Sequence, residues 1–115
     1  MNTNDLRITP FAKRVYAAVA AIPRGRVSTY RLVAAAVGCG SARAIGQALK
    51  RNPFAPRVPC HRVIASGLTL GGFRGKTRGR ALGDKMALLA AEGVVFEEGR
   101  LKEPRRLFTF AGGRP

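Results

Sequence analysis

With 115 residues, 46% of them hydrophobic, the chain is long enough for one compact core and too short for a second folded domain. Its 21 Lys and Arg against 6 Asp and Glu give a formal net charge of +15. This imbalance argues against an ordinary enzyme of small neutral substrates and favours nucleic acid as the partner. A GC-rich genome that inflates the arginine content is the competing explanation.

No stretch of the sequence approaches the roughly 18 apolar residues of a membrane-spanning helix, and no signal peptide follows Met1. We therefore expect an intracellular protein, cytoplasmic or nuclear, that is not secreted and has no membrane partner. Cys39 and Cys60 are expected to be free thiols. The single His and the absence of a C-x-x-C pair exclude an ordinary four-ligand zinc site, so no metal is expected. Cys39 fits a packing residue in a tight turn better than a reactive thiol.

A first helix is predicted over residues 10–21. Residues 1–8 are polar and are expected to be loose. Thr9-Pro10 is typical of a helix start, with Thr as the N-cap and Pro at the first helical position. The apolar residues that recur at helical spacing are Phe11, Val15, Ala18, Val19 and Ile22.

Two short helices separated by a glycine turn come next. Ser28 or Thr29 caps the second helix, which ends at Gly38, and Ser41 caps the third. The inward stripe of the third helix is predicted to be Ala44, Ile45, Ala48 and Leu49. This arrangement predicts a helix-turn-helix.

The third helix is slim and basic. Arg43, Gln47 and Lys50 lie outside its inward stripe, and the small residues Ala44 and Gly46 leave its surface without bulky side chains. Such a helix can approach DNA closely; a solvated helix with charged ends is the alternative.

The second half of the chain predicts loops, one helix and a hairpin. The prolines in residues 52–56 exclude a helix interior there, and Cys60 is expected where an extended segment meets a turn. Residues 67–83 have the composition of a long glycine-rich loop. A last helix is predicted over residues 81–91, with an inward face of Leu82, Met86, Leu88 and Leu89.

The expected fold is mainly α with a small β hairpin, a helix-turn-helix domain of winged-helix type. The hairpin is predicted between Val94 and Leu101. We expect a flexible N-terminus over residues 1–8, one DNA-binding and catalytic domain over residues 9–102, and a basic, irregular tail over residues 103–115 that Phe108 and Phe110 hold in place.

Cys60 stands next to His61, the one imidazole of the chain. A thiolate is a strong nucleophile and an adjacent base lowers the cost of forming it, so this pair suggests nucleophilic chemistry. A buried cysteine beside a structural histidine is the alternative. Because neighbouring side chains of an extended segment point to opposite faces, His61 needs a turn or a bridging water to act on the thiol.

Five segments occur in an order that resembles the O6-alkylguanine-DNA alkyltransferases, also called methylated-DNA–protein-cysteine methyltransferases. Pro59-Cys60-His61-Arg62-Val63-Ile64 is similar to the active-site signature of this family. The other four segments are similar to the start of its helix-turn-helix, its arginine finger, its asparagine hinge and its closing motif: Val27-Ser28-Thr29-Tyr30, Arg43-Ala44-Ile45-Gly46, Asn52-Pro53 and Leu88-Leu89-Ala90-Ala91-Glu92-Gly93.

The resemblance implies a role for each matched position. Cys60 would be the nucleophile that takes the alkyl group, with His61 as base through a water and Glu92 orienting the imidazole. Asn52 would hold the turn around the site. Tyr30 would press on the phosphate backbone and donate a proton to the leaving base.

The resemblance also implies a DNA surface and a base pocket. Arg43 would fill the gap in the base stack when the alkylated guanine is flipped out of the duplex. The implied DNA contacts are Thr29, Tyr30, Arg43, Ala44, Gly46, Gln47 and Lys50. The implied pocket consists of Tyr30, Val63, Phe73, Arg74 and Gly75.

The implied activity is that of a single-turnover S-methyltransferase in DNA repair. A thioether on Cys60 has no easy hydrolytic exit, so one transfer would consume the protein. Neither a metal nor an organic cofactor is needed. We expect a monomer that binds duplex DNA carrying O6-alkylguanine, with repair proteins as further partners.

Three features depart from the family pattern and leave two alternatives open. The usual N-terminal domain of the family is missing, Phe73-Arg74 replaces a Tyr-Ser pair, and a basic glycine-rich insert covers residues 76–83. The alternatives are a lesion sensor of the alkyltransferase-like type, which binds without transfer, and a helix-turn-helix transcription regulator. Such sensors typically carry Trp at the nucleophile position, so Cys60 argues against the first alternative.

Overall fold

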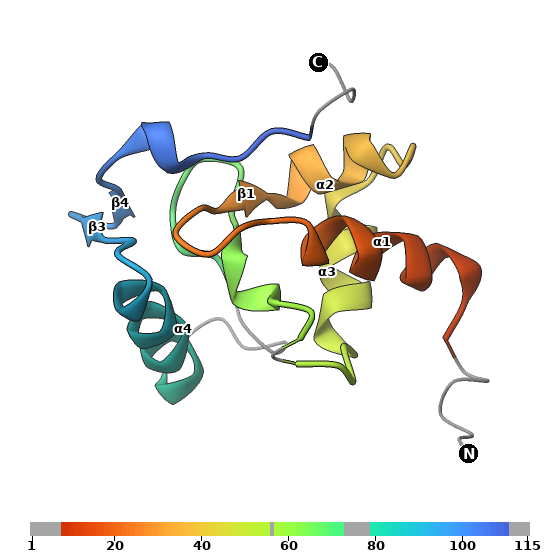
Figure 1. Ribbon diagram of the computed structural model, residues 1–115, viewed down its shortest axis with the longest axis horizontal. Helices are drawn as coiled ribbons and strands as arrows, with labels where there is room; N and C mark the ends of the chain where they lie inside the picture. The colour runs from red at the N-terminus through yellow and green to blue at the C-terminus, as the bar shows by residue number, and fades with distance from the viewer. Residues whose placement is uncertain (1–7, 56, 73–78, 111–115) are drawn as a thin grey trace.

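The computed structural model describes residues 8–55, 57–72 and 79–110. Three helices lie together on one side of the molecule and a fourth lies on the other, with short strands between and beside them (Figure 1). The helices are α1 (Pro10–Ala20), α2 (Tyr30–Ala36), α3 (Ala42–Lys50) and α4 (Arg80–Ala91), and short 3₁₀ turns are η2 (Cys60–Arg62) and η3 (Pro104–Arg106). The strands are β1 (Ser28–Thr29), β2 (Val63–Ile64), β3 (Phe96–Glu97) and β4 (Arg100–Leu101). The expectation of a mainly α fold with a small β hairpin is confirmed.

A hydroxyl side chain begins each of the first three helices. The Thr9 hydroxyl accepts from Ala12 N at 3.0 Å, that of Thr29 from Leu32 N at 3.1 Å, and that of Ser41 from Ala44 N at 3.1 Å. Each bond satisfies a backbone donor that has no partner inside its own helix, and such a cap contributes roughly 1 kcal/mol. The sequence prediction of these three helix starts is confirmed.

The first three helices enclose the larger hydrophobic core. Val15, Val19, Val33 and Ile45 are completely buried in it, and burial of each such side chain contributes roughly 1.5–3 kcal/mol. The Tyr16 hydroxyl donates to Ala48 O at 2.7 Å and so ties α1 to α3. The helix-turn-helix of α2 and α3 therefore rests on α1 as a rigid base.

A parallel strand pair joins the two halves of the molecule. Ser28 of β1 stands opposite Val63 of β2, and Thr29 stands opposite Ile64. This pairing places the segment before α2 directly beside the segment that follows Cys60. A second, smaller core lies on the far side of the pair and consists of Val27, Ile64, Leu89, Val94 and Leu101.

The predicted inward face of α4 is wrong in two positions. Met86 is 47% exposed and Leu88 is 40% exposed, whereas Lys85 is completely buried and shares the inner face with Leu89. Residues 85 and 89 are four apart and therefore lie above one another on a helix, while 86 and 88 flank that row. A lysine occupies the inner position because backbone carbonyls surround its ammonium group, as described below.

The hairpin of β3 and β4 is followed by a segment that returns across the molecule toward α2 (Figure 1). Phe96 pairs with Leu101 in the hairpin, and Leu107 forms a parallel bridge with Val27. The rings of Phe108 and Phe110 meet edge to face at 5.1 Å. The division into domains at residues 8 and 102 stays a prediction. Among the described residues, no helix combines the length and the apolar character needed to cross a membrane.

Candidate active site and DNA-binding face

Cys60 begins the turn η2 and its side chain is half-buried against the larger core. Its backbone N–H donates to Val58 O at 2.8 Å, and the N–H of Val63 donates back to Cys60 O. Both cysteines of the chain lie in the described part and are free thiols. The thiol of Cys60 is therefore held by a rigid turn without being sealed in hydrocarbon.

His61 points at Glu92, the residue that follows α4. The His61 Nε2 and Glu92 Oε2 atoms are 3.0 Å apart, and His61 is only 6% exposed. As the sequence predicted, a turn meets an extended segment here: the 3₁₀ turn η2 leads directly into β2, and it directs the imidazole to the carboxylate. Nε2 donates to the ionised carboxylate, and in the neutral imidazole this leaves Nδ1 as the acceptor.

Arg62 holds the same carboxylate at two points. Its Nε donates to Glu92 Oε1 at 2.9 Å and its Nη2 to Oε2 at 2.8 Å, while Nη1 donates to Ile22 O at 2.9 Å. Burial of Glu92 favours the neutral acid, but hydrogen bonds and charge from Arg62 and His61 outweigh it and lower the pKa from 4.5 to about 2. Glu92 is thus a fixed anion at neutral pH.

Asn52 closes the loop that leads to the thiol. Its Nδ2 donates to Val58 O at 2.9 Å and its Oδ1 accepts from Phe54 N at 2.8 Å. Val58 O also accepts a hydrogen bond from the backbone N–H of Cys60. The Asn52 side chain therefore fixes the carbonyl group that holds the Cys60 backbone. The hinge role that the sequence suggested for Asn52 stays a prediction.

Tyr30, the first residue of α2, lies close enough to Cys60 for their charges to interact. Its hydroxyl donates to Gly72 O at 3.2 Å. Burial, and then the charge of Cys60, raise its pKa from 10.0 to about 12. The phenol is therefore protonated at neutral pH and can act as a proton donor.

Lys85 holds the backbone segments that lie beside Tyr30. Its Nζ donates to the carbonyl oxygens of Val63, Leu70 and Gly72 at 2.8, 2.7 and 2.8 Å. Gly72 O thus accepts from both Tyr30 and Lys85. Burial lowers the pKa of Lys85 to about 7, and the charge of Cys60 opposes this shift.

Exposed polar side chains cover the outer face of α3. Arg43, Gln47 and Lys50 are exposed, while Ala44 and Gly46 are half-buried and leave the backbone approachable. The contact of this face with DNA stays a prediction.

Thr29, which the sequence also suggested as a DNA contact, is only 4% exposed. Its hydroxyl caps α2, so the structure gives this side chain a structural task. Phe73, Arg74 and Gly75, predicted to line the base pocket, lie outside the described residues, as do residues 76–78 of the basic insert. Val63 is completely buried under the site.

Sequence reasoning missed the tasks of Arg62 and Lys85. Arg62 stood inside the active-site motif, so its position carried a signal. For Lys85 the signal was the spacing to Leu89, which puts a lysine on the inward row of α4.

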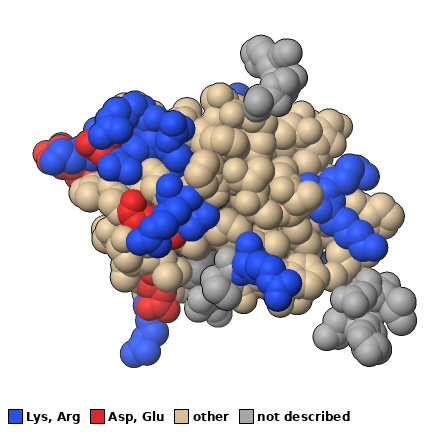
Figure 2. All heavy atoms as spheres, viewed as in Figure 1, with Lys and Arg blue, Asp and Glu red and all other residues tan. Residues whose placement is uncertain are grey.

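Basic side chains are spread unevenly over the face shown in Figure 2. They gather with acidic ones over the β3–β4 hairpin and the segment after it. A separate basic group lies at the right, over α1, and a broad area over α2 carries little charge.

Residues 10–94 match the sequence profile of a family described as 6-O-methylguanine DNA methyltransferase, DNA binding domain. A methylated-DNA–protein-cysteine methyltransferase of Saccharolobus islandicus is 44% identical over 94 residues, which are 82% of this chain and 58% of that protein. The enzyme of the same name from Methanothermobacter thermautotrophicus is 45% identical over 77% of this chain and 47% of its own length. The chain thus spans about half the length of these curated relatives.

Two kinds of solved structure resemble this one. The O6-methylguanine methyltransferase of Mycobacterium tuberculosis is 41% identical, with a TM-score of 0.63 over 73% of this chain and 48% of that one. S. pombe Atl1, in complex with damaged DNA containing O6-carboxymethylguanine, is 33% identical, with a TM-score of 0.70 over 96% of this chain and 100% of that one.

Proposed function

We propose that this protein, which belongs to the family of the 6-O-methylguanine DNA methyltransferase DNA-binding domain, repairs duplex DNA by taking an alkyl group from the O6 atom of guanine onto Cys60. The observation that carries the proposal is the array of Cys60, His61, Glu92 and Arg62. It provides an accessible thiol, a base beside it in sequence, and a fixed anion that stabilises the base when it becomes a cation.

The transfer step follows from these groups. His61 Nδ1 accepts the thiol proton through a water molecule while Glu92 holds Nε2, and the resulting imidazolium gains a paired anion. The thiolate attacks the alkyl carbon in line with the C–O bond, a C–S bond forms, and the electron pair of the broken bond stays on the guanine. Tyr30 donates a proton to the departing base, and the proton on His61 returns to Tyr30 through solvent, so the protons balance.

The target guanine must leave the base stack before the thiol can reach it. The O6 atom points into the major groove, and an alkylated guanine pairs poorly, so extruding it costs less than extruding an intact base. The slim face of α3 approaches the DNA, and Arg43 occupies the space that the base vacates. Because a thiolate is a poor leaving group from an alkyl carbon, each molecule reacts once.

Intact-protein mass measurement tests the proposal. After incubation with a duplex that contains one O6-methylguanine, the protein gains one methyl group on the peptide that contains Cys60. Cys60→Ala abolishes the gain and keeps binding to the lesion, whereas Cys39→Ala, the matched control, gains the methyl group normally. Methylation of Cys39 in place of Cys60, or an unchanged mass at full lesion binding, overturns the assignment.

A lesion sensor without transfer is the second candidate. The observation that favours it is the match to Atl1, which covers nearly the whole chain, whereas the M. tuberculosis methyltransferase covers less of it. The same experiment separates the two functions, because a sensor binds the methylated duplex and its mass stays constant.

A further inference from the structure

We propose that Arg106 is a positioning residue for Glu92: from the segment after the hairpin it clamps the backbone that aims this carboxylate at His61. The proposal rests on the function proposed above, since its purpose is to hold the base of the transfer reaction. Arg106 lies outside residues 10–94, the part of the chain that matches the family profile.

The segment that carries Arg106 is attached to both sides of the site. Leu101 N donates to Leu68 O at 2.8 Å, in the loop that leads to Gly72. Further along, Val27 N donates to Arg106 O at 3.0 Å, just before the strand that precedes Tyr30. Arg106 is therefore part of a strap that spans the domain, which Figure 1 shows as the crossing from β4 toward α2.

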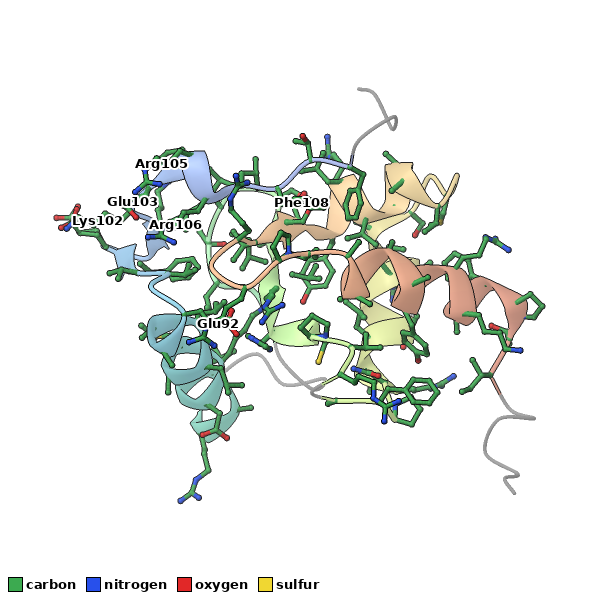
Figure 3. The ribbon with its side chains drawn as sticks, viewed as in Figure 1. Glu92, Lys102, Glu103, Arg105, Arg106 and Phe108 are labelled. Carbon is green, nitrogen blue, oxygen red and sulfur yellow. The ribbon has the colours of Figure 1, made fainter. Side chains whose placement is uncertain are left out.

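The Arg106 guanidinium is held between an acid and a backbone carbonyl. Its Nε donates to Glu103 Oε1 at 2.5 Å and its Nη1 to Gly25 O at 2.9 Å. The side chain is 22% exposed, so most of it is covered. Figure 3 shows Arg106 beside Glu103 on the segment after β4, near the end of α4 from which Glu92 projects.

Two glycines lie between the guanidinium and Glu92. A Cβ atom on Gly25 would lie 3.4 Å from Glu92 O and 3.6 Å from Arg106 Nη1. One on Gly93 would lie 3.5 Å from Arg106 Nη2. Both glycines have φ near +87° and +86°, a conformation that L side chains rarely adopt. Gly25 and Gly93 thus leave room only for backbone between Arg106 and Glu92, and Gly25 is bonded directly to Arg106 through its carbonyl oxygen.

The position of the backbone at the end of α4 determines where the carboxylate of Glu92 points. Glu92 is the C-cap of α4, so the helix fixes its backbone from one side only, and Gly93 follows at once. Arg24, from the same loop as Gly25, donates to Ala91 O at 2.9 Å. If Arg106 releases Gly25, the loop and the end of α4 can shift together, and a displacement of roughly 1 Å is enough to spoil a catalytic hydrogen bond.

The neighbouring residue Arg105 provides a matched control. It carries the same charge and also faces Glu103, at 3.3 Å, but its side chain is 73% exposed. Within the described part of the chain, its side chain forms no hydrogen bond or ion pair with the two glycines or with Glu92. Loss of one positive charge on this segment is therefore equal in Arg105→Met and Arg106→Met, and only the second change removes the clamp.

The nuclear magnetic resonance spectrum of His61 provides the test. The chain has a single histidine, so the imidazole signals need no assignment experiment. In the unmodified protein the Nε2 proton, held by Glu92, gives a slowly exchanging signal. We expect Arg106→Met to broaden or abolish this signal and to slow methyl transfer about tenfold or more, by the cost of misplacement. Arg105→Met leaves both unchanged, and Arg106→Lys, which keeps one donor for Gly25 O, recovers part of each.

Two outcomes overturn the proposal. In the first, Arg106→Met lowers the melting temperature and leaves the His61 signal and the transfer rate intact, which is the result for a purely structural residue. In the second, Arg106→Met does not fold, and Glu103→Gln and Arg106→Lys fold with an unchanged His61 signal. If the unmodified protein transfers no methyl group, the proposed function fails, but the spectrum still decides the role of Arg106.

Discussion

Arg62 and Glu92 form a two-point ion pair across the base of the site, with Nε–Oε1 and Nη2–Oε2 distances of 2.9 and 2.8 Å. The Oε2 atom also lies 3.0 Å from His61 Nε2. One carboxylate therefore serves a structural cation and the imidazole at the same time. The orientation of His61 consequently depends on Arg62, although the two side chains do not need to touch.

We predict that Arg62→Met lowers the free energy of unfolding by about 3 kcal/mol, because a nearly buried carboxylate loses both of its hydrogen bonds from Arg62. It also slows methyl transfer, since Glu92 is then free to turn away from His61. Arg62→Lys has a smaller effect of the same sign, because an ammonium cannot make two parallel bonds. Urea denaturation and transfer kinetics measure the two effects. Arg105→Met is the control: Arg105 lies 3.3 Å from Glu103 but is 73% exposed, and its loss changes stability little.

The acid stability of the protein should depend on Glu92. Its pKa is 4.5 in the unfolded chain and about 2 in the folded protein, so between these values the unfolded chain binds more protons. The stabilisation by Glu92 is therefore complete above pH 4.5 and is lost as the pH falls toward 2. Glu92→Gln lowers stability at neutral pH and flattens this acid dependence. Equal acid dependence in Glu92→Gln and in the exposed control Glu97→Gln contradicts the prediction.

Local features of the sequence were sufficient to predict the helix-turn-helix. Thr9, Thr29 and Ser41 each precede an apolar run, and the capping bonds they predict connect residues only three apart. The inward residues Ile45 and Leu49 of α3 follow from helical spacing in the same way. Such contacts depend on a few neighbouring residues, so the sequence alone contains them.

The contacts that complete the site join distant parts of the chain, and composition does not predict them. β1 and β2 are two residues each and pair across 35 positions, from Ser28 to Val63, so no alternation pattern marks them. Lys85 is buried because three carbonyls from two different segments surround its ammonium group. Helical spacing combined with hydrophobicity predicts a lysine on the surface. The sequence therefore predicts Met86 and Leu88 on the inner face, where the structure has Lys85.

Removal of the Lys85 ammonium group should lower the free energy of unfolding, because this group holds two backbone segments of the site together. In Lys85→Met the carbonyls of Val63, Leu70 and Gly72 lose a buried donor, and each unsatisfied group costs roughly 1–3 kcal/mol before relaxation. Because removal of a buried charge offsets part of this cost, we predict a net destabilisation of about 2–4 kcal/mol. Urea denaturation measures it, with the exposed helix residue Lys50→Met as control. A Lys85→Met protein as stable as the control contradicts the prediction.

The pH dependence of the same variant has a definite sign. Burial lowers the pKa of Lys85 from 10.5 to about 7, so between these values the folded protein releases a proton that the unfolded chain retains. Stability from this group therefore increases as the pH rises above 7. We expect the stability difference between the unmodified protein and Lys85→Met to grow from pH 7 to pH 9. A difference that stays constant over this interval means that the three carbonyls keep the pKa of Lys85 at or above 10.5, and it contradicts the prediction.

Arg43 tests whether the outer face of α3 acts on the DNA duplex itself. Its side chain is exposed on the slim face of the helix, where it can enter the base stack. Since unstacking costs a few kcal/mol, we predict that Arg43→Ala slows methyl transfer from duplex DNA about tenfold or more, and leaves the reaction with a free O6-alkylated guanine base within about twofold. Arg31→Ala, which removes an exposed charge from α2, is the control for a purely electrostatic loss. If Arg43→Ala slows the reaction of the duplex and of the free base equally, the residue does not support base flipping. If Arg31→Ala slows the reaction with duplex DNA as much as Arg43→Ala does, the effect of Arg43 is due to its charge alone.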